Sequence, residues 1–219
     1  MGKYPKINSL FKRDEKTHKF IENEWTCDEF EYLKDNQWYF TEKVDGTNIR
    51  IHWEPSTKVD TVEDVLMIGG RTDNAQIPVF LLEKLNEIFT VEKMKEAYPD
   101  MPMTLYGEGF GARIQKGGGN YIKDGVDFAL FDIKIDDYWL KREDVVDIGF
   151  KLDLQVVPVV TIGTIAKAID IVKHGLKSYW GDFDAEGLVI KPCVPLMRRG
   201  GGQIVAKVKT KDFAKIEKK

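Results

Sequence analysis

Short β-type segments separated by turns dominate the sequence, and they restrict the possible folds most. Residues 37–43 are rich in Trp, Tyr, Phe and Thr, and residues 48–53 place Ile49, Ile51 and Trp53 on one face. An Asp-Gly step, typical of a β-hairpin, separates these two segments. Further strands are predicted at residues 65–71, 103–110, 127–135, 156–162, 185–191 and 203–209. Because strands predominate and only a few helices interrupt them, we expect an α+β fold with mainly antiparallel sheets.

Three helices are predicted between these strands. One begins at Pro78 and runs to about residue 98, a second covers residues 142–152, and a third follows the capping residue Thr164. Residues 1–36 are charged with scattered aromatic side chains, which predicts an irregular or short-helical lead-in. A length of 219 residues suits one domain, so we expect a single domain over residues 1–219.

Composition excludes several classes of protein. No apolar run approaches the roughly 18 residues that a membrane helix needs, and the N-terminus has no signal-peptide core. Cys27 and Cys193 are far apart, which favours reduced thiols. His18, His52 and His174 form no cluster with ligand spacing. We therefore expect a cytoplasmic protein without a membrane span or a structural zinc site.

Charge is distributed unevenly along the chain. Residues 191–219 hold nine Lys or Arg and two Asp or Glu, whereas the remaining residues hold 24 basic and 34 acidic side chains. A basic segment on an acidic body indicates an anionic ligand near the C-terminal end. A solvated tail is the alternative for the last few lysines.

One lysine, Lys43, is a candidate nucleophile because it ends a predicted strand immediately before a turn. An ordinary lysine has a pKa of roughly 10.4, so a nucleophilic lysine needs burial or neighbouring cations that disfavour the ammonium form. Lys191, Lys207 and Lys209 can supply those cations, and alternation places Lys207 and Lys209 on one strand face. Two lysines on one face are costly unless an anion such as a triphosphate binds there.

Acidic residues at strand ends are candidates for the same site. Asp45, Glu108 and Glu186 each need a partner, which could be metal-bound water, a ribose hydroxyl or a lysine. In a straight strand Glu186 and Lys191 fall on opposite faces, so a twist or a bulge must bring both to one ligand. The glycine-rich segment at 107–111 does not match the dinucleotide fingerprint, and the sequence contains no P-loop.

Six stretches, in order, resemble the motifs of the covalent nucleotidyltransferases, the superfamily of polynucleotide ligases and mRNA-capping enzymes. They are Lys43-Val44-Asp45-Gly46-Thr47-Asn48, Gly70-Arg71-Thr72, Tyr106-Gly107-Glu108-Gly109, Phe128-Ala129-Leu130-Phe131-Asp132-Ile133, Glu186-Gly187-Leu188-Val189-Ile190-Lys191 and Ala206-Lys207-Val208-Lys209. Within the superfamily the chain is most similar to the RNA ligase 2 family, although Asp45 stands where many members of that branch have histidine. The resemblance implies an ATP-grasp-like α+β nucleotidyltransferase domain of mainly antiparallel sheets flanked by helices, with no OB-fold domain.

The resemblance also implies roles for individual residues. Lys43 would attack the α-phosphate of ATP and carry AMP, and Lys191, Lys207 and Lys209 would bind phosphate and assist catalysis. Mg²⁺, or Mn²⁺, would lie near Asp45, Glu108 and Glu186, mostly through water. The expected nucleotide-binding residues are Glu42, Lys43, Asn48, Arg71, Glu108, Phe131, Glu186, Lys191 and Lys207.

The implied function is an ATP-dependent RNA ligase that joins a 5′-phosphate end to a 3′-hydroxyl end. The expected partner is RNA, as a nicked duplex, bound by a monomer. The basic pair Arg198 and Arg199 and the C-terminal lysines are candidates for contacts with the RNA backbone. A minimal ATP-dependent DNA ligase and a capping-type guanylyltransferase are alternatives, and a nucleic-acid-binding module with a decayed active site is an alternative of another class.

Overall fold

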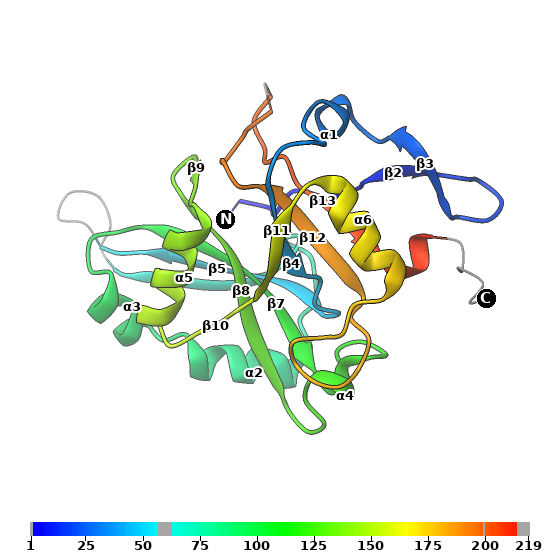
Figure 1. Ribbon diagram of the computed structural model, residues 1–219. Helices are drawn as coiled ribbons and strands as arrows, with labels where there is room; N and C mark the ends of the chain where they lie inside the picture. Colours follow the sequence, from blue (N-terminus) through cyan, green and yellow to red (C-terminus); the bar gives the residue numbers. More distant parts are fainter. Residues whose placement is uncertain (1, 57–62, 199, 214–219) are drawn as a thin grey trace. The chain divides into compact units, whose positions relative to one another are not determined.

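The computed structural model describes residues 2–56, 63–198 and 200–213 (Figure 1). The chain divides into two compact units. Unit 1 comprises Met1–Tyr4 and Asp45–Val157, and unit 2 comprises Pro5–Val44 and Pro158–Lys219. The boundary between Val44 and Asp45 therefore falls inside the motif that begins at Lys43. The single domain over residues 1–219 stays a prediction.

Unit 2 is built on a five-stranded sheet. Its strands, in spatial order, are β1 (Asn8–Ser9), β13 (Ala206–Lys209), β12 (Gly187–Pro192), β4 (Trp38–Glu42) and β11 (Val159–Gly163). All neighbouring strands are antiparallel except β1 and β13, which are parallel. The other elements of the unit are β2 (Phe11–Arg13), β3 (Phe20–Trp25), α1 (Asp28–Tyr32), α6 (Ile165–His174) and the 3₁₀ helix η1 (Thr210–Asp212).

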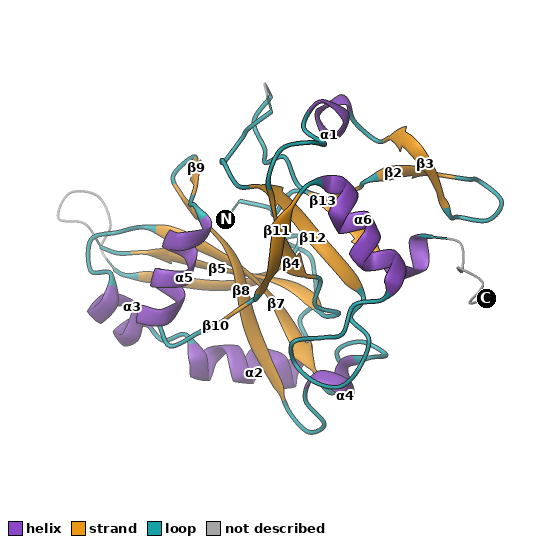
Figure 2. Cartoon of the chain, in the orientation of Figure 1, coloured by secondary structure: helices purple, strands orange, loops and turns teal. Residues whose placement is uncertain are grey.

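Alternation along these strands separates an apolar face from a polar one. The apolar face packs on α6 (Figure 2). It contributes Trp38, Phe40, Leu188, Ile190, Ala206 and Val208 to one hydrophobic core. The opposite face carries the side chains between them, including Thr41, Val189, Lys207 and Lys209, which are all partly exposed. The sequence pattern of residues 203–209 thus predicted correctly that Lys207 and Lys209 share a face.

Unit 1 is built on a six-stranded sheet. Its strands are β10 (Gln155–Val156), β8 (Val126–Ile135), β7 (Met103–Gly111), β5 (Thr47–Glu54) and β6 (Val65–Gly70), in that order, with β9 (Tyr138–Trp139) paired to β8. Its helices are α2 (Val79–Ile88), α3 (Val91–Ala97), α4 (Gly118–Tyr121) and α5 (Arg142–Lys151). Ile49, Ile51 and Trp53 are fully buried in a second core, as their alternation predicted. The predicted α+β class with mainly antiparallel sheets is confirmed.

Two local predictions are wrong, and a third is wrong in part. β4 and β5 form no hairpin, because both edges of β4 pair with β12 and β11 and both edges of β5 pair with β6 and β7. The helix predicted from Pro78 breaks, since Phe89 adopts an extended conformation and the Thr90 side chain caps α3 by accepting from the Lys93 amide. The lead-in contains the short helix α1, as predicted, but also β1, β2 and β3, and pairing along β13 allows Leu10 to be buried. None of the described helices is long and apolar enough to cross a membrane.

Candidate active site

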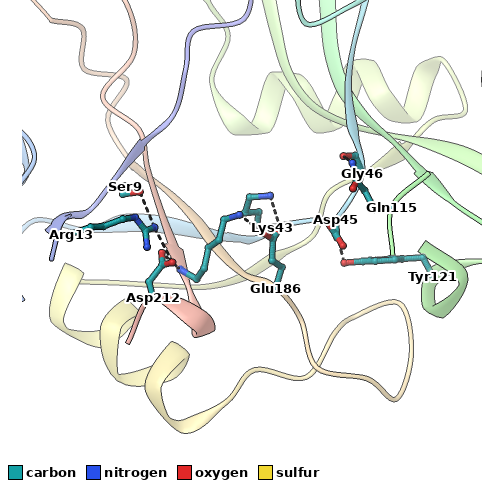
Figure 3. A network of polar contacts seen from close by, with 10 residues as sticks. Ser9, Arg13, Lys43, Asp45, Gly46, Gln115, Tyr121, Glu186 and Asp212 are labelled. Carbon is teal, nitrogen blue, oxygen red and sulfur yellow. Dashed lines mark hydrogen bonds and ion pairs between the residues drawn. The ribbon is translucent and has the colours of Figure 1, made fainter. Parts of the chain in front are cut away.

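In unit 2, Lys43 lies immediately after β4, where its backbone amide donates to the Gly187 carbonyl at 2.9 Å. Its Nζ contacts Glu186 Oε2 at 2.5 Å (Figure 3), and the other carboxylate oxygen of Glu186 contacts Lys209 Nζ. The three side chains are partly buried. Burial raises the pKa of Glu186, but the charges of Lys43 and Lys209 outweigh this and lower the pKa overall. One carboxylate therefore holds two ammonium groups together.

The backbone at Gly187 explains how Glu186 comes to face these lysines. Gly187 has a φ of +151°, a value that residues with a side chain rarely adopt. A Cβ at this position would also approach Lys209 Cα to 2.7 Å. The strand begins only at Gly187, so the alternation that puts Lys191 and Glu186 on opposite faces does not extend back to Glu186. Lys191 itself lies in β12 opposite Tyr39 of β4.

Lys207 adds a further cation to this face. It pairs with Val189 in β12, two residues before Lys209 on the same strand face. Burial lowers the pKa of Lys207, and the charges of Lys209, Lys43 and Arg13 lower it further. A half-buried lysine among other cations favours binding of an anion, because an anion would offset their mutual repulsion.

Glu42, the residue before Lys43, has a different environment. Its side chain is buried on the apolar side of the sheet, where Oε1 accepts from Ser178 Oγ at 2.7 Å and Oε2 accepts from the Tyr179 amide at 2.8 Å. Burial raises its pKa, although these two hydrogen bonds oppose that shift. Glu42 thus anchors the loop between α6 and β12. Its contact with a nucleotide stays a prediction.

In unit 1, the turn after the lysine motif is held against its own sheet. The Asp45 amide donates to the Tyr121 hydroxyl at 3.1 Å, and Gln115 Nε2 donates to the Gly46 carbonyl at 3.2 Å (Figure 3). Gly46 approaches β7 so closely that a Cβ would lie 2.7 Å from Glu108 Cγ. The loop between β7 and β8 therefore fixes the backbone of the turn.

A polar face of the unit 1 sheet brings Asn48 and Glu108 together. The two residues pair directly across β5 and β7, so their side chains project from the same face. Asn48 Oδ1 is buried and accepts no hydrogen bond from the described residues. A buried acceptor without a donor is costly, so this atom is suited to a ligand hydroxyl, a ligand amine or a water.

Phe131 occupies an irregular position in β8. The register with β7 shifts so that Tyr106 pairs with Asp132 and Gly107 pairs with Leu130, which leaves Phe131 between the two pairs. Its ring is half-buried and meets the Tyr4 ring edge-on at 5.0 Å between centroids. The sequence identified Phe131 by motif alone, and the bulge that orients it has no local signal.

Arg71 is exposed at the bend that follows β6. Arg50, which pairs with Gly69 of β6, is fully buried. The Arg50 guanidinium donates to the Gly70 carbonyl at 2.6 Å and to Asp73 Oδ1 at 3.0 Å. These contacts organise the backbone that carries Arg71.

The basic C-terminal segment is only partly described. Arg198 contacts Cys27 Sγ at 3.2 Å and Glu29 Oε1 at 3.5 Å, so it is tied to α1 and the residue before it. The predicted RNA contacts at Arg199, Lys215, Lys218 and Lys219 lie outside the described residues.

Three further polar residues near these contacts were not singled out from the sequence. Tyr121 accepts from the Asp45 amide, and Arg13 and Asp212 form an ion pair. Asp212 had no local signal, since only its pairing with Arg13 distinguishes it. Arg13 lies in a strand too short for alternation to predict a face, and Tyr121 ends α4, which is too short to show a helical period.

The two sheets and the lysine-rich face agree with the resemblance to the polynucleotide ligases that the motifs indicated. A family model described as RNA ligase matches residues 36–209, so the chain belongs to the RNA ligase family. No curated protein matches the chain.

Several solved structures share the fold. The Naegleria gruberi RNA ligase, as a variant in apo form, matches with a TM-score of 0.65 and 18% identity, covering 96% of this chain and 58% of that one. Another variant of that ligase, with ATP and Mn, gives a TM-score of 0.63 and 19% identity over 95% and 58%. The same ligase with PPi gives 0.61 and 19% over 94% and 61%. The chain thus spans less than two thirds of these ligases, and at this identity the likeness concerns the fold.

Proposed function

We propose that this protein is an ATP-dependent RNA ligase in which Lys43 carries AMP as a covalent intermediate. The observation that carries the proposal is the convergence of Lys43 and Lys209 on the single carboxylate of Glu186, with Lys207 on the same sheet face. Lysine side chains are mostly exposed and are almost never fully buried unless they are paired. A surplus of partly buried cations around a candidate nucleophile suits a polyphosphate substrate.

The proposed reaction has three steps. The uncharged amine of Lys43 leaves Glu186 and attacks the α-phosphorus of ATP, so that a P–N bond forms and the P–O bond to the leaving pyrophosphate breaks. A 5′-phosphate oxygen of RNA then attacks the lysine-bound AMP, which breaks the P–N bond and restores the amine. Finally, a 3′-hydroxyl attacks the activated 5′-phosphorus and AMP leaves.

Cations of unit 2 would stabilise the first step. Lys207 and Lys209 offset the charge that develops on the phosphate oxygens, and Lys191 contributes another phosphate contact. The lowered pKa of Lys207 is consistent with a site that awaits an anion. Glu186 holds Lys43 and Lys209 in place before the nucleotide binds.

Residues of unit 1 would recognise the nucleoside. Arg71 and Glu108 contact the ribose, and Phe131 stacks on adenine, an interaction that its half-exposed ring permits. The unpartnered Asn48 Oδ1 accepts a hydrogen bond from the nucleotide. Glu42, the residue before Lys43, is also proposed to contact the nucleotide. Its hydrogen bonds to Ser178 and Tyr179 restrain the loop between α6 and β12.

A divalent cation, Mg²⁺ or Mn²⁺, would help to neutralise the phosphates. The described residues contain no group of three His, Cys, Asp or Glu side chains that could hold a metal by themselves. Magnesium commonly keeps several waters and binds substrate phosphates, so this donor set fits a metal that is shared with ATP. Asp45, Glu108 and Glu186 would orient its waters.

Family membership supports RNA as the substrate, and the Naegleria gruberi ligase structures with ATP and Mn, and with PPi, support the choice of nucleotide and metal. A nicked duplex, a monomeric state and a cytoplasmic location complete the proposal. RNA contacts at Arg198 and Arg199 belong to it as well.

The test is covalent labelling. Incubation of the protein with α-labelled ATP and Mg²⁺ should give a protein–AMP adduct that is visible by gel and adds the mass of one AMP. Lys43→Ala should give none, whereas Lys84→Ala, which removes an exposed ion pair on α2, should label like the wild type. An unlabelled wild-type protein would refute the proposal, and label from GTP instead of ATP would indicate a capping-type transferase.

A further inference from the structure

We infer that Arg13 and Asp212 are positioning residues that set Lys209, and through Glu186 also Lys43, for adenylylation. Neither residue belongs to a nucleotidyltransferase motif found in the sequence. The inference rests on the proposed function, because the rate that it concerns is that of protein–AMP formation.

Asp212 connects the end of β13 to the N-terminal segment. Its side chain is fully buried, and Oδ1 lies 2.8 Å from an Arg13 guanidinium nitrogen (Figure 3), as an ion pair that is not aligned as a hydrogen bond. Its other oxygen, Oδ2, accepts from the Lys209 amide at 3.3 Å, which caps η1 where β13 ends. The same carboxylate therefore fixes the backbone of Lys209 and pairs with Arg13.

Arg13 is itself held firmly in β2. Its guanidinium donates to the His18 carbonyl at 3.0 Å and to Ser9 Oγ at 3.2 Å, and it lies over the Phe20 ring at 4.9 Å. Ser9 belongs to β1, the strand that pairs with β13 opposite Lys207. Arginine suits this position because its planar guanidinium offers several donors in a fixed geometry, whereas lysine offers a single point charge.

Another contact ties the same two segments together. Lys19, in the turn between β2 and β3, donates through Nζ to the Lys211 carbonyl at 2.6 Å, next to Asp212. Two contacts from the N-terminal segment thus hold the chain just after β13: Arg13 pairs with the Asp212 side chain, and Lys19 donates to the Lys211 carbonyl. The backbone of Lys209 is fixed by contacts that leave its Nζ directed at Glu186.

Loss of Arg13 would leave Asp212 as a buried carboxylate without its cation. Such a charge is strongly destabilising, and the nearby ammonium groups become its available partners. Lys209 would then be drawn away from Glu186, and the carboxylate that orients Lys43 would lose its second lysine. The expected consequence is slower transfer of AMP to Lys43, in addition to any loss of stability.

A double-mutant cycle separates positioning from a general structural effect. Single-turnover protein–AMP formation is measured at saturating ATP for wild type, Arg13→Ala, Lys209→Ala and the double variant. We expect Arg13→Ala to slow the reaction about tenfold, equivalent to about 1.4 kcal/mol, but less than about twofold when Lys209 is already alanine. Arg13→Lys should recover part of the rate, because it retains a positive charge beside Asp212.

Lys12→Ala is the matched control, since Lys12 lies beside Arg13 in β2 but pairs only at the surface, with Glu24 at 3.8 Å. It should leave the rate unchanged. If Arg13→Ala proves too unstable to assay, Asp212→Asn, which keeps the shape but removes the charge, takes its place in the cycle.

Two results would overturn the inference. One is an unchanged rate for folded Arg13→Ala, and the other is an equal loss with and without Lys209, which would indicate a purely structural role. Both outcomes leave wild-type labelling intact. Failure of the proposed function would instead appear as a wild-type protein that forms no AMP adduct.

Discussion

Gly46 is the position at which one methyl group should damage the candidate active site most clearly. An added Cβ would meet the Gly109 carbonyl oxygen well inside ordinary contact and would lie 2.7 Å from Glu108 Cγ. The Glu108 approach alone falls about 0.7 Å short of the 3.4 Å at which ordinary contact begins. The carbonyl belongs to the β7 backbone, so the turn at Gly46 must move instead.

The expected cost of Gly46→Ala follows from this overlap. Overpacking of this kind costs about 1 to 3 kcal/mol, which for a protein of this size lowers Tm by roughly 2 to 12 °C. The turn follows Lys43 by three residues, and a misplacement of about 1 Å in a reacting group can cost roughly 100-fold in rate. Protein–AMP formation should therefore fall far more than the stability loss alone explains.

Gly119→Ala provides the same substitution at an unconstrained site. No atom lies within 4 Å of the Cβ that it would add, and Gly119 is in α4. Alanine favours a helix over glycine by roughly 0.5 to 1 kcal/mol, so this variant should be as stable as the wild type or slightly more stable. Thermal unfolding would give the Tm of both variants, and single-turnover labelling would give their rates of protein–AMP formation.

A Gly46→Ala protein with the Tm and labelling rate of the wild type would refute the close approach of the turn to β7. Equal losses in the two variants would show that glycine at Gly46 has no special steric role.

Two further outcomes are expected. Hydrogen bonds from Lys95 Nζ and the Ser56 amide lower the pKa of Asp64 from 3.8 to about 2. The charged carboxylate therefore stabilises the fold above pH 3.8, and this stabilisation is lost as the pH falls through about 2. Asp64→Asn should consequently be less stable than wild type near pH 6, with a difference that closes toward pH 2 in urea unfolding; a difference independent of pH would contradict the assignment. Asn48→Ala removes the buried Oδ1 that has no described donor, so it should unfold at or above the wild-type Tm without ATP yet gain less from added ATP. Equal ATP-induced Tm shifts in the two proteins would exclude a nucleotide contact at Asn48.

Local patterns in the sequence predicted the faces of individual strands well. Ile49 and Ile51 are buried, and Lys207 and Lys209 share the less buried face of β13. These results follow from the two-residue period of a strand, which is a local property and needs no knowledge of neighbours. The order of the six motifs likewise depends on the sequence alone, and the RNA ligase family match agrees with it.

Strand pairing was less predictable. The Asp-Gly step between β4 and β5 suggested a hairpin, but each strand finds both partners elsewhere, so the step connects two sheets. An Asp-Gly step indicates that the chain can reverse direction there. Which sheet each flanking strand joins depends instead on which strand edges are free to pair. That choice is made by segments far away in the sequence.

The same limit applies to the candidate site. Sequence alone identified Lys43, Glu186 and Lys209 as chemically suited residues, but the carboxylate that joins the two lysines depends on the conformation of Gly187. The sequence also could not show that Glu42 is buried against a loop or that Asp212 pairs with Arg13. A charged group can be buried only when remote segments supply its partners, and those partners are decided by the tertiary structure.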